Sequence, residues 1–204
     1  MALKVGIDFD NTLADYSGVF YQVGVELDWI PKHTLTTKTD VKAYFFNQGL
    51  PEQWTELQGI VYGSEIYRTQ VYVGAKEVIE QLLEKNVELY IISHKTKFPV
   101  IGEKISLHQA ALTWLHESAL IGSGAGMIPE KNIFFNETKE EKISKIAALN
   151  CDFFIDDLPS IFLDKSFPSG VKKIFFDPDE HYKNVDFAHF KESSWAGVGL
   201  ILNA

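Results

Sequence analysis

The chain contains a single cysteine, Cys151, among its 204 residues. No intramolecular disulfide can therefore form, and the sequence gives no sign of an oxidising compartment. Leu149, Phe153 and Phe154 surround Cys151, and this apolar setting favours a packed thiol over a reactive nucleophile.

Long apolar segments are also absent from the sequence. No apolar run approaches the roughly 20 residues that a membrane-spanning helix needs. The apolar stretch after Met1 is interrupted by Asp8 and Asp10, which excludes the pattern of a signal peptide. We therefore expect a cytoplasmic protein without a membrane partner.

Positive charge is in the minority. The 19 lysines and arginines face 28 aspartates and glutamates, which gives a formal net charge of −9. Such a chain gains little from a polyphosphate backbone, so we expect no nucleic acid polymer as a partner. A small phosphate ester remains compatible, because one cation and a few local donors outweigh the mean charge. The six histidines are scattered without the spacing of a zinc site.

The residues that are present predict a globular fold, since 46% are hydrophobic and 23% are charged. Short apolar segments, rich in β-branched and aromatic residues, end abruptly at polar ones and are typical of buried strands. These segments span residues 3–7, 87–92, 132–135, 152–155 and 171–176.

Helical patterns lie between the predicted strands, over residues 74–86, 105–116 and 138–149, with a further one at 193–202. Thr138 precedes Glu141 by three residues, which is the signature of a capping box at a helix start. Alternating strands and helices predict an α/β fold with a doubly wound parallel sheet. Ligands of such sheets bind at the carboxyl ends of the strands.

One connection is much longer than the others. About 60 residues separate the first strand from the next helix, far more than an ordinary loop contains. We predict that residues 15–72 form an inserted α-helical cap, and that residues 1–14 and 73–204 form the catalytic core. The many aromatic residues of this insert mostly favour a core of its own, although Tyr16, Phe20 or Tyr44 could stack on a sugar or base.

Two acids follow the first strand with one residue between them. Asp8 and Asp10 can both approach one ligand if the chain turns there, and one can attack while the other handles protons. Two solvated loop acids are the simpler alternative. That alternative loses ground because later strands deliver Ser93, Asn136 and the pair Asp156–Asp157 to the same edge.

The stretch from Asp8 to Leu13, DFDNTL, resembles the first motif (DxDxT) of the haloacid dehalogenase (HAD) superfamily of phosphohydrolases. Ser93 resembles the second motif, Lys142 the third, and Asp156–Asp157 the acidic fourth. The surrounding FIDDLP is similar to nucleotidase-like branches of the superfamily. The resemblance covers nearly the whole core, and it implies a Rossmann-like sheet.

The resemblance also implies roles for individual residues. Asp8 would attack a phosphoryl group and form an aspartyl-phosphate intermediate, while Asp10 would protonate the leaving oxygen and then activate water. Thr12 would help to fix the turn, Ser93 would bind a phosphoryl oxygen, and Lys142 would neutralise charge beside Asp8. An acid at the position of Asp10 favours a phosphatase over a dehalogenase.

The same resemblance implies Mg²⁺ as the cofactor. Asp8, the backbone carbonyl of Asp10, and either Asp157 or Asp156 would hold the ion, because Mg²⁺ prefers hard oxygen ligands. We count all four acids as candidate metal ligands, with Asp157 slightly favoured over Asp156.

Several neighbouring residues allow two interpretations. His94 and Lys95 follow Ser93 directly and could touch the substrate, with His94 taken as a phosphate-binding candidate, or they could lie in a solvated loop. Lys139 and Lys145 flank Lys142 as alternative third-motif lysines. Asp164 and Asp177 are interpreted as loop acids.

These observations predict a Mg²⁺-dependent phosphatase that hydrolyses a small phosphomonoester, either a nucleotide or a sugar phosphate. A phosphotransferase or phosphomutase would use the same residues, and a non-catalytic module that binds a phosphate ligand is the third possibility. The sequence does not set the oligomeric state.

Overall fold

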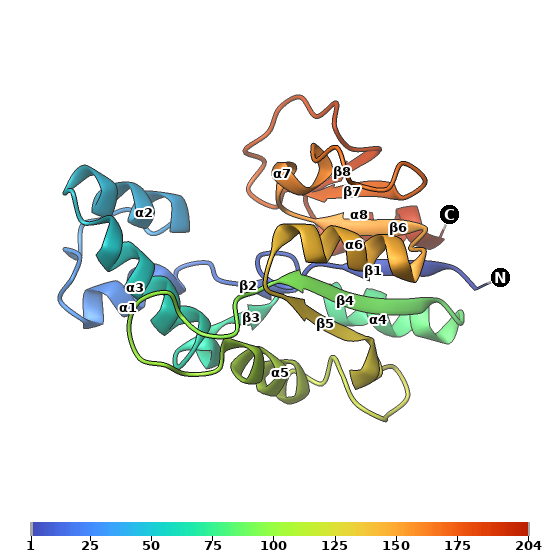
Figure 1. The fold of residues 1–204 in the computed structure, drawn as a ribbon, viewed down its shortest axis with the longest axis horizontal. Coiled ribbons are helices and arrows are strands. Elements are labelled where there is room, and N and C mark those ends of the chain that lie inside the picture. The colour runs from blue at the N-terminus through green and yellow to red at the C-terminus, as the bar shows by residue number, and fades with distance from the viewer. Residues whose placement is uncertain (1, 204) are drawn as a thin grey trace. The chain divides into compact units, whose positions relative to one another are not determined.

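The computed structural model describes residues 2–203 and contains a six-stranded sheet (Figure 1). The strands run in the order β5-β4-β1-β6-β7-β8, and all neighbouring pairs are parallel. Their bounds are β1 Lys4–Ile7, β4 Glu88–His94, β5 Ile133–Asn136, β6 Phe153–Asp156, β7 Lys172–Phe176 and β8 Phe190–Glu192. The predicted doubly wound parallel α/β fold is confirmed, and β8 is the one strand of this sheet that the sequence did not indicate.

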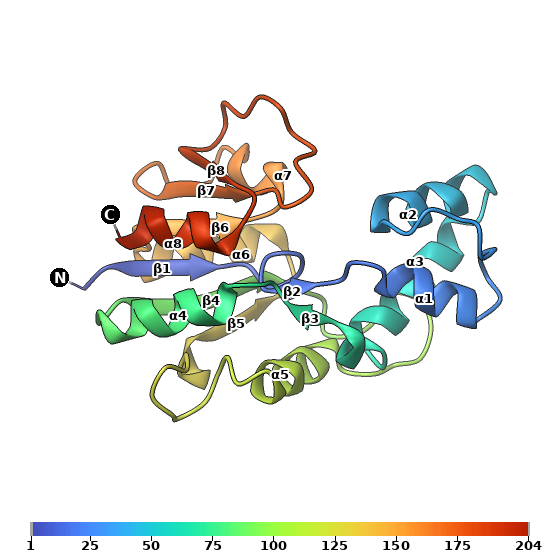
Figure 2. The same ribbon diagram turned by 180° about the vertical axis from the view of Figure 1, so that it is seen from behind.

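Helices cover both faces of this sheet (Figures 1 and 2). α4 (Ala75–Glu84) and α8 (Trp195–Asn203) pack against each other on one face. α6 (Lys139–Leu149) packs against β4 and β5 on the other face, where the short α7 (Pro159–Phe162) also lies. From β1 the strand order proceeds to β4 and β5 on one side and to β6, β7 and β8 on the other, so β1 lies at the switch point.

The start of α6 is fixed by the capping box that the sequence predicts. The Thr138 hydroxyl accepts a hydrogen bond from the Glu141 backbone N–H at 3.1 Å, and the Glu141 carboxylate accepts one from the Thr138 N–H at 3.2 Å. Because both bonds satisfy donors in the first turn, they set where the helix begins and which residues of that turn point to the sheet.

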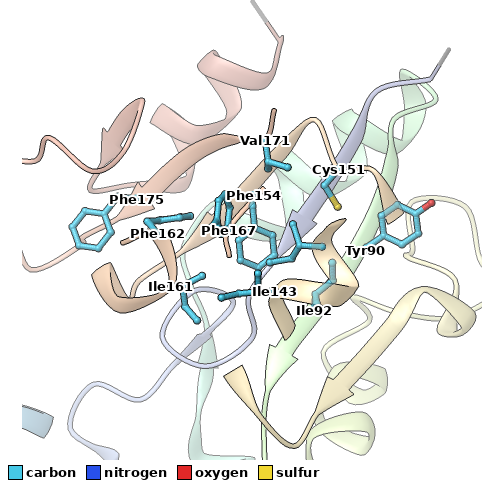
Figure 3. Packing of buried hydrophobic residues seen from close by; sticks show 11 residues of the cluster. Tyr90, Ile92, Ile143, Cys151, Phe154, Ile161, Phe162, Phe167, Val171 and Phe175 are labelled. Atoms are coloured by element: carbon cyan, nitrogen blue, oxygen red, sulfur yellow. The ribbon is translucent and has the colours of Figure 1, made fainter. Parts of the chain in front are cut away.

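A cluster of buried apolar residues lies between the sheet and helices α6 and α7 (Figure 3). Phe162 packs edge-on against Phe154 and Phe167, with ring centroids 6.5 and 5.5 Å apart. Cys151 belongs to this cluster and is 4% exposed. Burial raises the pKa of its thiol to about 12, so the thiol is protonated at neutral pH and packs as the sequence predicts.

The chain folds as two compact units. The first holds the six-stranded sheet and comprises Val71–Lys95, the chain up to Ala14 and the chain from His116 onward, including the 3₁₀ helix η2 (Glu130–Asn132). The second comprises Asp15–Gln70 and Thr96–Leu115. Two-residue strands β2 (Ala14–Asp15) and β3 (Gln70–Val71) pair with each other where the chain passes between the units. The role of residues 15–72 as a cap domain stays a prediction.

The second unit is helical. It contains α1 (Val19–Glu26), α2 (Lys38–Asn47), α3 (Pro51–Tyr62), the 3₁₀ helix η1 (Ile66–Arg68) and most of α5 (Leu107–Glu117). The rings of Phe20 and Phe45 both pack against Trp54, which confirms an aromatic core. Tyr16 is 2% exposed and Phe20 is fully buried, so both pack in this core instead of presenting a stacking surface.

Among residues 2–203, no helix combines the length and the apolar character that crossing a bilayer requires.

Gly6 provides a test of packing at the centre of the sheet. A Cβ atom at Gly6 would lie 2.6 Å from the Phe154 ring and 3.1 Å from Ile92, whereas one at Gly170 would meet nothing within 4 Å. We expect Gly6→Ala to lower the free energy of unfolding by about 1–3 kcal/mol. Urea denaturation measures this loss, with Gly170→Ala as the matched control. Equal stability of the two variants would contradict the close packing of β1 against β6.

Candidate active site

The segment after β1 turns back sharply on itself. The Leu13 N–H donates to the Phe9 carbonyl at 3.0 Å, and Asn11 adopts a left-handed backbone with φ of 57°. Asparagine tolerates this conformation better than most residues. The turn leaves Asp8 and Asp10 together at the carboxyl edge of the sheet, as the motif predicts.

Thr12 is fully buried within this turn. Its backbone carbonyl accepts a hydrogen bond of 2.8 Å from the indole N–H of Trp195, at the start of α8. Its hydroxyl has no hydrogen-bond partner among residues 2–203. The turn is therefore held through the carbonyl of Thr12, and no pattern in the sequence predicts that Trp195 does this.

Lys142 contacts two of the predicted acids. Its ammonium donates to an Asp8 carboxylate oxygen at 2.7 Å and to an Asp156 oxygen at 2.6 Å, and its side chain is only 1% exposed. Lys139 instead forms a surface ion pair, and Lys145 lies over the ring of Phe134 at 4.4 Å. Of the three candidate lysines, the structure brings Lys142 to the acids.

Burial and charge change the acidity of this group. Burial, together with the nearby Asp156, raises the pKa of Asp8 to about 7 against the opposing effect of Lys142. Burial acts to lower the pKa of Lys142, but the adjacent Asp156 and Asp8 outweigh it and hold that pKa above the usual value. A carboxylate at the position of Asp8 therefore gains from any further positive charge.

Three of the four predicted acids form a cluster that suits a metal ion. One carboxylate oxygen each from Asp8, Asp156 and Asp157 lies within 4.8 Å of the others. Three hard oxygen donors fit Mg²⁺. Both oxygens of Asp156 already accept hydrogen bonds, from Lys142 and from the Leu158 N–H, which favours Asp157 as the direct ligand.

Ser93 and His94 end strand β4 with different surroundings. Ser93 is 1% exposed, and its hydroxyl has no hydrogen-bond partner among the described residues. His94 is exposed, and its Nε2 lies 3.1 Å from the Glu137 carbonyl oxygen. Within residues 2–203, His94 makes no hydrogen bond or ion pair with the predicted acids, so its part in substrate binding stays a prediction.

Lys95 belongs to the site more closely than the sequence suggested. It is 4% exposed, and its ammonium lies 2.9 and 2.8 Å from the two carboxylate oxygens of Asp10. Its backbone N–H donates to the Asn136 carbonyl at 2.8 Å, and the Asn136 amide donates to the Ser93 carbonyl at 3.0 Å. A lysine just after a strand is usually exposed, so the sequence alone does not distinguish a site residue from a residue of a solvated loop.

Asp177, at the end of β7, holds a loop. Its carboxylate accepts hydrogen bonds from the backbone N–H groups of His181 and Tyr182, both at 3.0 Å, and pairs with Lys191 at 2.9 Å. Burial acts to raise the pKa of Asp177, but these bonds outweigh it and lower that pKa. The interpretation of Asp177 as a loop acid agrees with these contacts.

Known proteins share this architecture. No family model matches the sequence. A protein of Oceanobacillus iheyensis named "putative nucleotidase" is 25% identical over 194 residues, which cover 91% of this chain and 93% of the relative. A HAD hydrolase from Bacillus subtilis, solved with bound magnesium, superposes with a TM-score of 0.61 at 15% identity over 100% of this chain and 99% of its own.

A predicted phosphoglycolate phosphatase from Haemophilus somnus superposes with a TM-score of 0.57 at 12% identity, over 98% of this chain and 97% of its own. These solved structures share the parallel sheet and its helices with the present chain. The chain therefore has the fold of HAD-superfamily hydrolases, and the predicted resemblance to this superfamily is confirmed.

The contacts of Asp177 predict a pH-dependent contribution to stability. Since folding lowers its pKa from the usual 3.8, the carboxylate stabilises the fold above that pH, and the effect is lost as the pH falls through the lowered value. At pH 7, Asp177→Asn should lower the free energy of unfolding by about 1–3 kcal/mol. Denaturation at pH 7 and pH 3 should show this gap narrowing in acid, while exposed Asp179→Asn shows none. A gap of constant size would contradict the assignment.

Proposed function

We propose that the protein is a Mg²⁺-dependent phosphatase that hydrolyses a small phosphomonoester through an aspartyl-phosphate on Asp8. The observation that carries this proposal is the buried ion bridge of Lys142 to Asp8 and Asp156, beside the carboxylate cluster completed by Asp157. A nucleophile so close to positive charge can approach an anionic phosphoryl group.

In the first half of the reaction, an Asp8 carboxylate oxygen attacks phosphorus. The bond between phosphorus and the leaving oxygen breaks, and Asp10 donates a proton to that oxygen. In the second half, Asp10 takes a proton from water, whose oxygen attacks phosphorus. The bond between phosphorus and the Asp8 oxygen breaks, which releases inorganic phosphate and frees the Asp8 carboxylate. Asp8 and Asp10 then return to their starting states, so one water is consumed in each cycle.

Buried hydroxyls supply the contacts for the phosphoryl oxygens. Those of Ser93 and Thr12 have no hydrogen-bond partner among the described residues, and a buried polar group without one costs stability. A bound phosphoryl group would satisfy such hydroxyls. Lys142 would balance the charge that gathers on the phosphoryl oxygens and on Asp8.

Asp8 and Asp157, together with the backbone carbonyl of Asp10, would hold the metal, and Asp156 would support it through Lys142. When bound, Mg²⁺ supplies charge neutralisation and orientation for the phosphoryl group. The cluster of three carboxylates supports this assignment, as does the magnesium bound to the similar Bacillus subtilis hydrolase.

We propose a nucleotide or a sugar phosphate as the substrate. The Oceanobacillus iheyensis relative named as a nucleotidase supports a nucleotide, and a sugar phosphate suits the same phosphoryl chemistry. A phosphotransferase would use the same residues but pass the phosphoryl group to an alcohol. Free phosphate measured against phosphorylated acceptor separates the two activities.

Asp8→Asn tests the nucleophile. The amide cannot attack phosphorus, so we expect the turnover number to fall by at least about 10³-fold while the fold is kept. Phosphate release from a panel of nucleotides and sugar phosphates with Mg²⁺ measures this, with Asp179→Asn as a surface control. Retained activity would remove Asp8 as the nucleophile, and undiminished activity in excess EDTA would contradict the metal requirement. No release by the wild type from any member of the panel would favour a non-catalytic binding module.

Metal binding itself can be followed without turnover. A ligand that binds only the folded state stabilises it, by about 2.7 kcal/mol at a concentration 100 times its Kd. We expect Mg²⁺ to raise the Tm of the wild type and of Asp179→Asn. Asp157→Asn should weaken Mg²⁺ binding by about 10-fold or more. Equal Mg²⁺ affinity in all three proteins would exclude Asp157 as a ligand.

A further inference from the structure

Lys95 and Asp10 form an ion pair between two segments that are 85 residues apart in the chain. The ammonium is within hydrogen-bond distance of both oxygens of one carboxylate, at 2.9 and 2.8 Å. The Lys95 side chain is 3% exposed and the Asp10 side chain 18%. The cation is therefore buried, and the acid is the more exposed member of the pair.

The ammonium of Lys95 is fixed from further directions. Its Nζ lies 5.1 Å from the centre of the Phe9 ring, which is fully buried, at a distance where a cation is attracted to an aromatic face. The backbone N–H of Lys95 donates a hydrogen bond to the carbonyl of Asn136 at the end of β5. A cation held in this way determines how the carboxylate that contacts it is rotated.

We propose that Lys95 is a positioning residue that orients the Asp10 carboxylate toward the leaving oxygen of the substrate, an assignment that rests on the proposed function. The terminal torsion of an aspartate is broad and roughly two-fold, so the carboxylate needs an outside contact to fix it. An acid must lie about 2.6–3.2 Å from the atom it protonates. Misplacement by about 1 Å can cost about 10²-fold in rate.

This role differs from that of Lys142. Lys142 contacts the nucleophile Asp8 and the buried Asp156, whereas Lys95 contacts the proposed acid and base, Asp10. The two buried lysines therefore serve different steps. Loss of Lys95 should impair proton transfer more than attack on phosphorus.

The identity of the leaving group separates these steps. An alkyl phosphate needs a proton on its leaving oxygen, whereas p-nitrophenyl phosphate releases a stable anion that needs none. Lys95→Met should lower kcat/KM for an alkyl phosphate by about 10- to 100-fold and that for p-nitrophenyl phosphate much less. The ratio kcat/KM reports the steps up to transfer of the phosphoryl group to Asp8. The later attack by water on the aspartyl-phosphate therefore does not affect it.

The experiment compares wild type, Lys95→Met, Lys95→Arg and the control Lys139→Met, which loses only a surface ion pair. Lys95→Arg keeps the positive charge and can donate hydrogen bonds to both Asp10 oxygens, so it should recover part of the alkyl phosphate activity. A measurement of Tm shows whether Lys95→Met folds. If it does not, Lys95→Arg is compared with the wild type in its place. In an Asp10→Asn background, Lys95→Met should have no further effect on alkyl phosphate hydrolysis, because residues that act as a unit are not additive.

Three results would overturn the assignment. The first is an unchanged ratio between the two substrates in Lys95→Met or, if that variant does not fold, equal losses on both substrates in Lys95→Arg. The second is additive losses in the double variant. The third is a Kd for inorganic phosphate with Mg²⁺ weakened more than about 10-fold, measured by calorimetry, which would mean that Lys95 binds the phosphoryl group itself. A wild type that hydrolyses neither substrate would instead remove the proposed function, and the role of Lys95 with it.

Discussion

The ion bridge of Lys142 to Asp8 and Asp156 is the interaction on which the arrangement of the site depends. Three charged side chains, each no more than 5% exposed, meet at one ammonium, which lies 2.7 Å from an Asp8 oxygen and 2.6 Å from an Asp156 oxygen. Removing charges from water is costly, and their attraction offsets the cost only when the geometry is good. That geometry needs β1 and β6 as neighbours and α6 capped at Thr138. The ion bridge therefore depends on both the order of the strands and the capping box of α6.

Charge balance explains why an acidic site can receive an anion. The four predicted acids outnumber the two buried lysines that contact them by two carboxylates. This excess is the charge that one divalent cation balances. It also agrees with the raised pKa of Asp8, since a buried carboxylate that lacks enough positive charge nearby tends to hold its proton. Under the proposed function, part of the negative charge of the chain is therefore the charge that the metal would balance.

Much of the fold and of the candidate site could be predicted from local patterns in the sequence. The strands before Asp8, Ser93 and Asp156 are apolar runs that end at polar residues, and Thr138 with Glu141 marks the start of α6. Lys95 was predicted only as a residue that could touch the substrate or lie in a solvated loop. Its contact with Asp10, and that of Trp195 with Thr12, could not be predicted because the partners lie 85 and 183 residues apart in the chain. Strand β8 was missed because its three residues, Phe190–Glu192, are too short for an alternating pattern.

The exposure of the two motif acids follows the chemistry proposed for each. The side chain of Asp8 is 5% exposed and is hydrogen-bonded to Lys142, whose side chain is 1% exposed, which suits a nucleophile that need meet only one phosphorus atom. The side chain of Asp10 is 18% exposed, which suits a group that must meet both a leaving oxygen and a water. A more exposed carboxylate also has more freedom to rotate, so Asp10 has the greater need of a fixed cation behind it. Lys95 meets that need from the buried side of the pair, since its side chain is 3% exposed against 18% for Asp10.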